Sequence, residues 1–216
     1  MQRLVQTEIL DSLPTCNVDA IASRRDLVKI NHLMGNYRWI RAKIAASLTT
    51  KSDHYLEIGA GDGTLGKRLI KHSPIVTYDA LDFASRPTSW PSGSKWFSAD
   101  ILQFEEYSRY THLIANLILH HFESDELSAL GAKINESGVR HIVACEPCRR
   151  SFHKVQLRAG KLIGFNYVTL NDGCVSVEAG FRGDELPDLL GLSRAEWTWQ
   201  ITETWMGAYR MLAKRK

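Results

Sequence analysis

The sequence predicts an α/β fold: a mostly parallel sheet of seven strands, with helices at the N-terminus and an antiparallel hairpin at the C-terminus. Three observations support this prediction. Apolar runs typical of strands alternate with helical segments from residue 54 to residue 162, which favours a parallel sheet with helices on both faces. A turn with three glycines in five positions follows the first run. The end of the chain contains two more apolar runs, which meet near Met206-Gly207.

Helices are predicted within the first 50 residues. The stretch "SRRD" at 23–26 has the form of a capping box, and an apolar stripe beginning at Leu27 follows it at helical spacing. Gly35-Asn36 interrupts the pattern, and a second helix is expected over residues 37–48. We expect residues 1–50 to form a helical cap over the ligand end of the sheet.

Residues 51–216 are expected to form the main α/β domain. Its predicted strands before the hairpin are 54–59, 75–83, 94–102, 111–119 and 139–147. Its predicted helices are 64–71, 124–137, 151–162 and 183–192, with a turn at "NDG", residues 171–173.

The composition is that of an ordinary globular protein, with 44% hydrophobic residues and a formal charge of +3. That charge is too small to predict a nucleic-acid partner, and no segment is apolar for long enough to predict a membrane span. The N-terminal segment lacks an apolar signal core, so we expect a cytoplasmic protein with reduced cysteines. "CEPC" gives Cys145 and Cys148 zinc-like spacing, but no second ligand pair accompanies them, so no metal site is expected.

The glycine turn raises the question of its ligand. Gly61, Gly63 and Gly66 form a G-x-G-x-x-G pattern, which is typical of dinucleotide sites. Glu57 before the turn and Asp62 inside it would repel a pyrophosphate. A ligand with its own positive charge suits this turn better. S-adenosylmethionine carries a sulfonium and an ammonium, and it has no phosphate.

The stretch "LEIGAGDG" at 56–63 resembles the first motif of the class I S-adenosylmethionine-dependent methyltransferases, a family with a Rossmann-like sheet. The resemblance extends from Tyr55 to Arg150. It implies that S-adenosylmethionine is the cofactor and that the turn holds it. The turn residues expected to do so are Glu57, Gly59, Ala60, Gly61 and Gly63.

Later strand ends continue this resemblance. In the family an acid after the second strand holds the ribose hydroxyls; "YDALDF" offers Asp79 and Asp82, and we prefer Asp82 because it ends the apolar run. "FSADIL" resembles the adenine-binding motif, which implies roles for Asp100 and Ile101. Asn116, at the end of the fourth strand, is also expected to contact the cofactor.

The acceptor is expected to be a small molecule. "NLILHHF" at 116–122 resembles the stretch found in small-molecule members of the family, and it lacks the Pro-Pro sequence of enzymes that methylate base amines. "INHLMGNYRW" and "NDGCVSVEAGF" resemble a bacterial subgroup with small aromatic or polyketide-like substrates. This likeness predicts O-methylation of a phenolic or polyketide-like acceptor in secondary metabolism.

Two histidines follow the fourth strand, where a general base would help to ionise a phenol. Neighbouring side chains of a strand point to opposite faces, so we expect only one of His120 and His121 to matter. Glu146 is an alternative base, and Arg149 is a candidate for holding an acidic substrate.

Several alternatives remain open at this stage. Tyr37 and Trp39 either stack on the acceptor or pack in the core. The chain is either an enzyme, as a monomer or homodimer, or a methyltransferase-fold binding subunit without catalysis. A dinucleotide-binding oxidoreductase is disfavoured by the two acids of the glycine turn.

Overall fold

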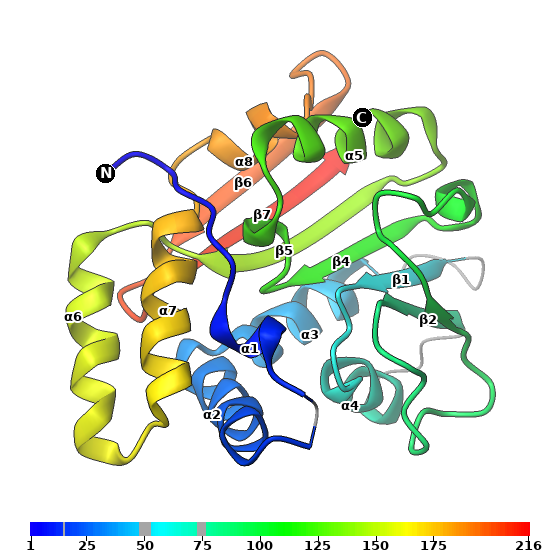
Figure 1. Cartoon of the computed structure of the whole chain (residues 1–216). Helices are drawn as coiled ribbons and strands as arrows, with labels where there is room; N and C mark the ends of the chain where they lie inside the picture. The colour runs from blue at the N-terminus through cyan, green and yellow to red at the C-terminus, as the bar shows by residue number, and fades with distance from the viewer. Residues whose placement is uncertain (15, 48–52, 73–76) are drawn as a thin grey trace.

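The computed structural model describes residues 1–14, 16–47, 53–72 and 77–216. Its centre is a seven-stranded sheet in the order β3-β2-β1-β4-β5-β7-β6 (Figure 1). Strands β1 to β5 run parallel, while β7 is antiparallel to β5 and to β6. The strands are β1 (His54–Ile58), β2 (Thr77–Asp82), β3 (Trp96–Ser98), β4 (His112–Asn116), β5 (His141–Pro147), β6 (Trp197–Glu203) and β7 (Ala208–Arg215). This arrangement confirms the predicted mixed sheet and its C-terminal hairpin.

Helices cover both faces of the sheet, which explains why the central strands are apolar runs without alternation. Helices α3 (Asn36–Ser47) and α4 (Thr64–His72) pack on one face, where Tyr55 of β1 lies in their core. Helices α5 (Ser124–Glu136) and α8 (Glu185–Leu189) pack on the other face, together with Leu56.

A group of helices lies beside the carboxyl ends of the strands (Figure 1). It contains α1 (Ile9–Ser12), α2 (Val18–Met34), α6 (Ser151–Ala159) and α7 (Tyr167–Ala179). Helix α7 contacts each of the other three, so the N-terminal segment and residues 151–179 build this layer together. The expected domain boundary at residue 50 lies outside the described residues. No described helix is both long and apolar enough to cross a membrane.

The predicted start of the first long helix at "SRRD" is wrong. Helix α2 begins at Val18, because the side chain of Asn17 caps it by accepting the backbone N–H groups of Asp19 (2.8 Å) and Ala20 (3.2 Å). Ser23 is buried inside the helix, where its hydroxyl accepts a hydrogen bond from Thr169 of α7 at 3.1 Å.

The predicted turn at "NDG" is also wrong, because these residues lie inside α7. Packing explains why a turn-like sequence is helical here. The buried carboxylate of Asp172 accepts the backbone N–H groups of Ile9 and Leu10, each at 2.9 Å, and so binds the start of α1. A Cβ on Gly173 would lie 3.0 Å from Leu157, so glycine allows α6 to pack closely on α7.

Candidate active site

The glycine turn after β1 has a backbone that favours glycine. Gly59, Gly61 and Gly63 all have positive φ angles, of 65°, 58° and 72°. A Cβ on Gly59 would lie 2.3 Å from Cγ1 of Ile118, whereas a Cβ on Gly61 would meet nothing within 4 Å. Gly59 therefore lets the segment after β4 pack against the turn, and Gly61 leaves open space beside it.

Three acidic side chains surround this turn. Glu57 is buried, and its Oε2 accepts a hydrogen bond from the hydroxyl of Tyr78 at 2.8 Å. Burial raises the pKa of Glu57 to about 8, and the nearby charges of Asp82 and Asp62 act in the same direction against the Tyr78 hydrogen bond. A cationic ligand at this turn would lower the pKa of Glu57 and favour its ionised form.

Asp82 and Asp79 of β2 have different surroundings. Asp82 ends the strand, and its Oδ2 accepts the backbone N–H of Gly61 at 2.7 Å. Asp79 is buried, and its two oxygens accept hydrogen bonds from the Lys95 backbone (2.7 Å) and the Tyr110 hydroxyl (2.9 Å). Asp82 thus lies at the glycine turn, while Asp79 is paired within the protein.

The segment after β3 approaches the same strand end. The backbone N–H of Ala99 donates to the carbonyl of Asp82 at 3.1 Å, which places Asp100 close by in the chain. Asp100 is half-buried and accepts the backbone N–H of Leu102 at 2.8 Å. Ile101 is buried in the core on the α5 side of the sheet.

Asn116 ends β4, next to β1 in the sheet. Its Nδ2 donates to Oδ1 of Asn31 on α2 at 3.0 Å, and Asn36 donates to the same oxygen at 3.2 Å. Its Oδ1 is buried and has no hydrogen-bond partner among the described residues. A buried acceptor without a partner is costly, so this oxygen is available to a ligand at the strand end.

Glu146 of β5 holds the segment that follows β4. This segment forms the short 3₁₀ helix η2 (Leu119–His121). The fully buried carboxylate of Glu146 accepts the backbone N–H groups of Ile118 (3.2 Å) and Leu119 (3.0 Å), and it hydrogen-bonds to Nδ1 of His120 at 2.7 Å. Glu146 therefore holds η2 in position through these hydrogen bonds, and its carboxylate is enclosed by protein.

His120 and His121 both lie close to the N-terminal segment. Nε2 of His120 is 3.7 Å from Oε1 of Glu8, and Nδ1 of His121 is 3.8 Å from Oδ2 of Asp11. The two imidazole rings are 4.3 Å apart. The expectation that they diverge is wrong, because η2 is a helical turn and only a strand sends neighbouring side chains to opposite faces.

The pKa values of the two histidines differ. Burial alone would lower the pKa of His120, but the carboxylates of Glu146 and Glu8 outweigh burial and raise the pKa to about 9. For His121, burial lowers the pKa and the adjacent His120 lowers it further. The side chain of His120 is 4% exposed, whereas that of His121 is 29% exposed. An acceptor can therefore reach His121 more easily than His120.

No protein-family model matches the chain. The uncharacterized methyltransferase Rv0089 of Mycobacterium tuberculosis is 31% identical over 101 residues, which cover 41% of this chain and 48% of the relative. An uncharacterized methyltransferase of Mycobacterium bovis matches to the same extent. The matched segment spans about half the length of these relatives.

Solved structures match over nearly the whole chain. The plantazolicin methyltransferase BamL, in complex with a triazolic desmethylPZN analog and S-adenosylhomocysteine (SAH), has a TM-score of 0.71 over 96% of this chain and 92% of its own, at 8% identity. The chain has the Rossmann-like methyltransferase fold. The pyocyanin biosynthetic protein PhzM matches with a TM-score of 0.60 over 97% of this chain and 62% of its own, at 19% identity. The fold predicted from the sequence is confirmed.

Tyr37 of α3 interacts electrostatically with Asp62 of the glycine turn and with Glu57 before it. The guanidinium of Arg68, on α4, lies 5.0 Å from the centre of its ring. Burial raises the pKa of Tyr37 to about 12, and the charge of Asp62 contributes. Trp39 instead packs against the core on the α3 side, with the cation of Arg210 5.6 Å from its ring.

Arg149 has an internal role in the structure. Its buried guanidinium donates to the carbonyls of Gly180 (3.0 Å) and Met1, and it forms an ion pair with Glu185. It joins the start of the chain to α8, and its charge is already paired. This geometry gives no support to its expected contact with an acidic substrate.

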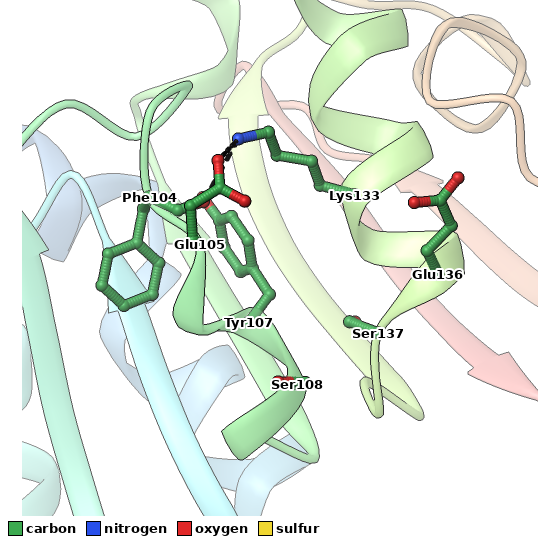
Figure 2. Close-up of a pocket in the computed structure, with 7 residues that line it drawn as sticks. All are labelled: Phe104, Glu105, Tyr107, Ser108, Lys133, Glu136 and Ser137. Carbon is green, nitrogen blue, oxygen red and sulfur yellow. Dashed lines mark hydrogen bonds and ion pairs between the residues drawn. The ribbon is translucent and has the colours of Figure 1, made fainter.

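A separate hollow lies between the 3₁₀ helix η1 (Glu106–Arg109) and α5 (Figure 2). Lys133 and Glu105 form an ion pair across it. Because η1 immediately precedes β4 and Ser137 precedes β5, this hollow lies at the amino ends of the strands. Ligands of such sheets bind at the carboxyl ends, so the hollow is not part of the candidate site.

Three residues near the site were not predicted from the sequence. Glu8 and Asp11 approach the histidines, and Asn31 bonds to Asn116. All three come from the first 50 residues. Glu8 and Asp11 belong to no recognisable motif, and Asn31 lies in "INHLMGNYRW", where only Tyr37 and Trp39 were singled out. The spacing of a sequence motif could not have found them, because their positions depend on how α2 and α7 pack.

Alanine substitutions at Gly59 and Gly61 test whether Ile118 packs against Gly59. Gly59→Ala should lower the free energy of unfolding by about 2–5 kcal/mol, since the strained positive φ costs about 1–2 kcal/mol and the clash with Ile118 about 1–3 kcal/mol. Gly61→Ala should cost only the backbone contribution of about 1–2 kcal/mol. Urea unfolding followed by circular dichroism measures both. Equal losses would show that Ile118 does not pack on the turn as described.

Proposed function

We propose that this chain is an S-adenosylmethionine-dependent methyltransferase that methylates a small molecule, most specifically a phenolic or polyketide-like hydroxyl. The observation that carries the proposal is the set of three carboxyl groups at the glycine turn. Burial raises the pKa of Glu57 to about 8, with the charges of Asp82 and Asp62 acting in the same direction, so a positively charged ligand would favour its ionised form. This environment suits a ligand with a sulfonium and an ammonium and disfavours a pyrophosphate.

The residues at the strand ends fit such a cofactor. Gly61 provides open space next to the backbone, Asp82 lies at the end of β2, and Asn116 offers an unpaired carbonyl oxygen. The bound cofactor would supply the methyl group. The residues proposed to hold it are Glu57, Gly59, Ala60, Gly61, Gly63, Asp82, Asp100, Ile101 and Asn116.

The acceptor side is proposed to lie between η2 and the N-terminal helices. His121 is the partly exposed member of the histidine pair and is proposed to contact the acceptor hydroxyl. His120 and Glu146 hold η2 in place and act through His121 as positioning residues. Tyr37 is proposed to line the same space from the side of α3, with Trp39 packed behind it. Holding the acceptor in line with the methyl donor and away from water is the main contribution of such a site.

The solved structures support a small-molecule acceptor by analogy of fold. BamL and PhzM, by their descriptions, act in the synthesis of plantazolicin and pyocyanin. One further match, with a TM-score of 0.54, is described as a putative O-methyltransferase. At identities of 8–19%, these proteins establish the fold and do not identify the acceptor.

Ligand choice tests the proposed cofactor directly. Isothermal titration calorimetry should show that SAH binds and that NAD does not, because the acids of the turn repel a pyrophosphate. SAH lacks the sulfonium charge, so a tighter complex is expected with S-adenosylmethionine. Micromolar binding of NAD together with no heat from SAH would overturn the proposed function.

The two acids of β2 form a matched pair for testing the ribose contact. Asp82→Ala should weaken SAH binding about 10- to 150-fold, since hydrogen bonds to a charged group contribute about 1.5–3 kcal/mol. Asp79→Asn should leave SAH affinity nearly unchanged, because Asp79 bonds to Lys95 and Tyr110 instead. The reverse pattern in the same titrations would reassign the ribose ligand to Asp79.

The role of His121 can be measured in turnover. His121→Ala should lower kcat roughly 10²–10⁴-fold with little change in SAH affinity, because the imidazole contacts the acceptor and not the cofactor. His72→Ala, which removes an exposed histidine at the end of α4, is the control and should retain full activity. Mass spectrometry of candidate phenols incubated with S-adenosylmethionine supplies the assay. Full turnover by His121→Ala at saturating acceptor would exclude this residue from catalysis.

A further inference from the structure

Three potential metal ligands meet beside the carboxyl end of β4. Glu8 precedes α1, and His120 and His121 belong to η2. One ligand atom from each of the three side chains lies within 4.8 Å of the others. Two imidazoles and one carboxylate are a common ligand set for a divalent transition metal with an open coordination position.

Two of the three side chains, His120 and Glu8, have a second hydrogen-bond partner that orients them. Nδ1 of His120 is hydrogen-bonded to the buried Glu146 at 2.7 Å, so its Nε2 is directed at Glu8. The carboxylate of Glu8 accepts a hydrogen bond from the hydroxyl of Ser176 on α7. Asp11 lies 3.8 Å from Nδ1 of His121. A carboxylate behind a ligating histidine is the usual outer support of a protein metal site.

The separation of the ligand atoms also fits a bound ion. Nε2 of His120 and Oε1 of Glu8 are 3.7 Å apart, which is too far for a hydrogen bond. Zinc binds nitrogen and oxygen at about 2.0–2.2 Å, so two ligands of one tetrahedral ion are about 3.3 Å apart. Small rotations of the partly exposed Glu8 and His121 side chains would close the cluster around an ion.

We propose that Glu8, His120 and His121 bind a divalent transition-metal cation of the zinc type, and that its open position takes the hydroxyl oxygen of the acceptor. The two imidazole ligands favour zinc or a similar metal over magnesium and calcium, which prefer oxygen. This proposal differs from the sequence-based expectation of no metal site, which was drawn from the spacing of Cys145 and Cys148. Its role toward the acceptor rests on the proposed function, whereas metal binding itself does not.

A cation in this position explains why both histidines face the same point. A metal ion lowers the pKa of an oxygen that it binds, so a hydroxyl acceptor would release its proton to water and be held as its anion. The histidine pair would then assist the reaction as metal ligands, without either ring taking the proton.

Metal binding can be tested on the whole chain without any methylation assay. After treatment with a chelator and dialysis, calorimetry should show that Zn²⁺ binds at one ion per chain, and bound Co²⁺ should show the visible d–d absorption of a four-coordinate ion. Glu8→Gln and His121→Ala should each weaken Zn²⁺ binding at least about 100-fold, and Glu146→Gln about 10- to 100-fold. His72→Ala is the matched control and should bind as the wild type does.

The same variants distinguish failure of the metal proposal from failure of the proposed function. If wild type binds Zn²⁺ no more tightly than Glu8→Gln, or if His72→Ala weakens binding equally, the three residues form only an ion-pair cluster and the metal proposal is overturned. Glu8→Gln preserves the shape of the side chain, and its thermal unfolding shows whether it is folded; His121→Ala provides a second variant. A chain that binds Zn²⁺ but not SAH would contradict the proposed function and leave the metal site standing.

Discussion

The buried carboxylate of Glu146 is the constraint on which the candidate site depends. It lies at the end of β5 with no exposure to water, so its charge must be matched by donors from the protein. These donors are the backbone N–H groups of Ile118 and Leu119 and the ring of His120. By fixing η2 in this way, Glu146 also places Ile118 over the glycine turn, where the missing side chain of Gly59 leaves room for it.

The N-terminal segment is fastened to the same region by charged side chains. Arg3 donates to the carbonyls of Phe122 (2.5 Å) and Ala179 (2.9 Å), and so links the end of η2 to the end of α7. Asp172 of α7 binds the backbone at the start of α1. The segment that carries Glu8 is therefore held close to the histidines.

Much of the cofactor side could be predicted from the sequence. The strands are buried on both faces, so each is a local apolar run, and a parallel sheet necessarily brings the carboxyl ends of neighbouring strands together. This is why Glu57, Asp82 and Asn116 could be assigned to one edge of the sheet. The sequence left Asp79 and Asp82 as alternatives, and the structure adds that Asp79 bonds to Tyr110 and Lys95.

The sequence by itself determined the succession of strands and helices along the chain, the glycine turn and the acids at the strand ends. These features depend on local patterns of hydrophobic periodicity and residue spacing. Only the tertiary structure decided the acceptor side. "NDG" is helical because Asp172 and Gly173 pack against other segments, and His120 and His121 converge because η2 is a helical turn that Glu146 holds. Contacts between residues far apart in the chain overrode the local preference in both cases, and no local pattern records them.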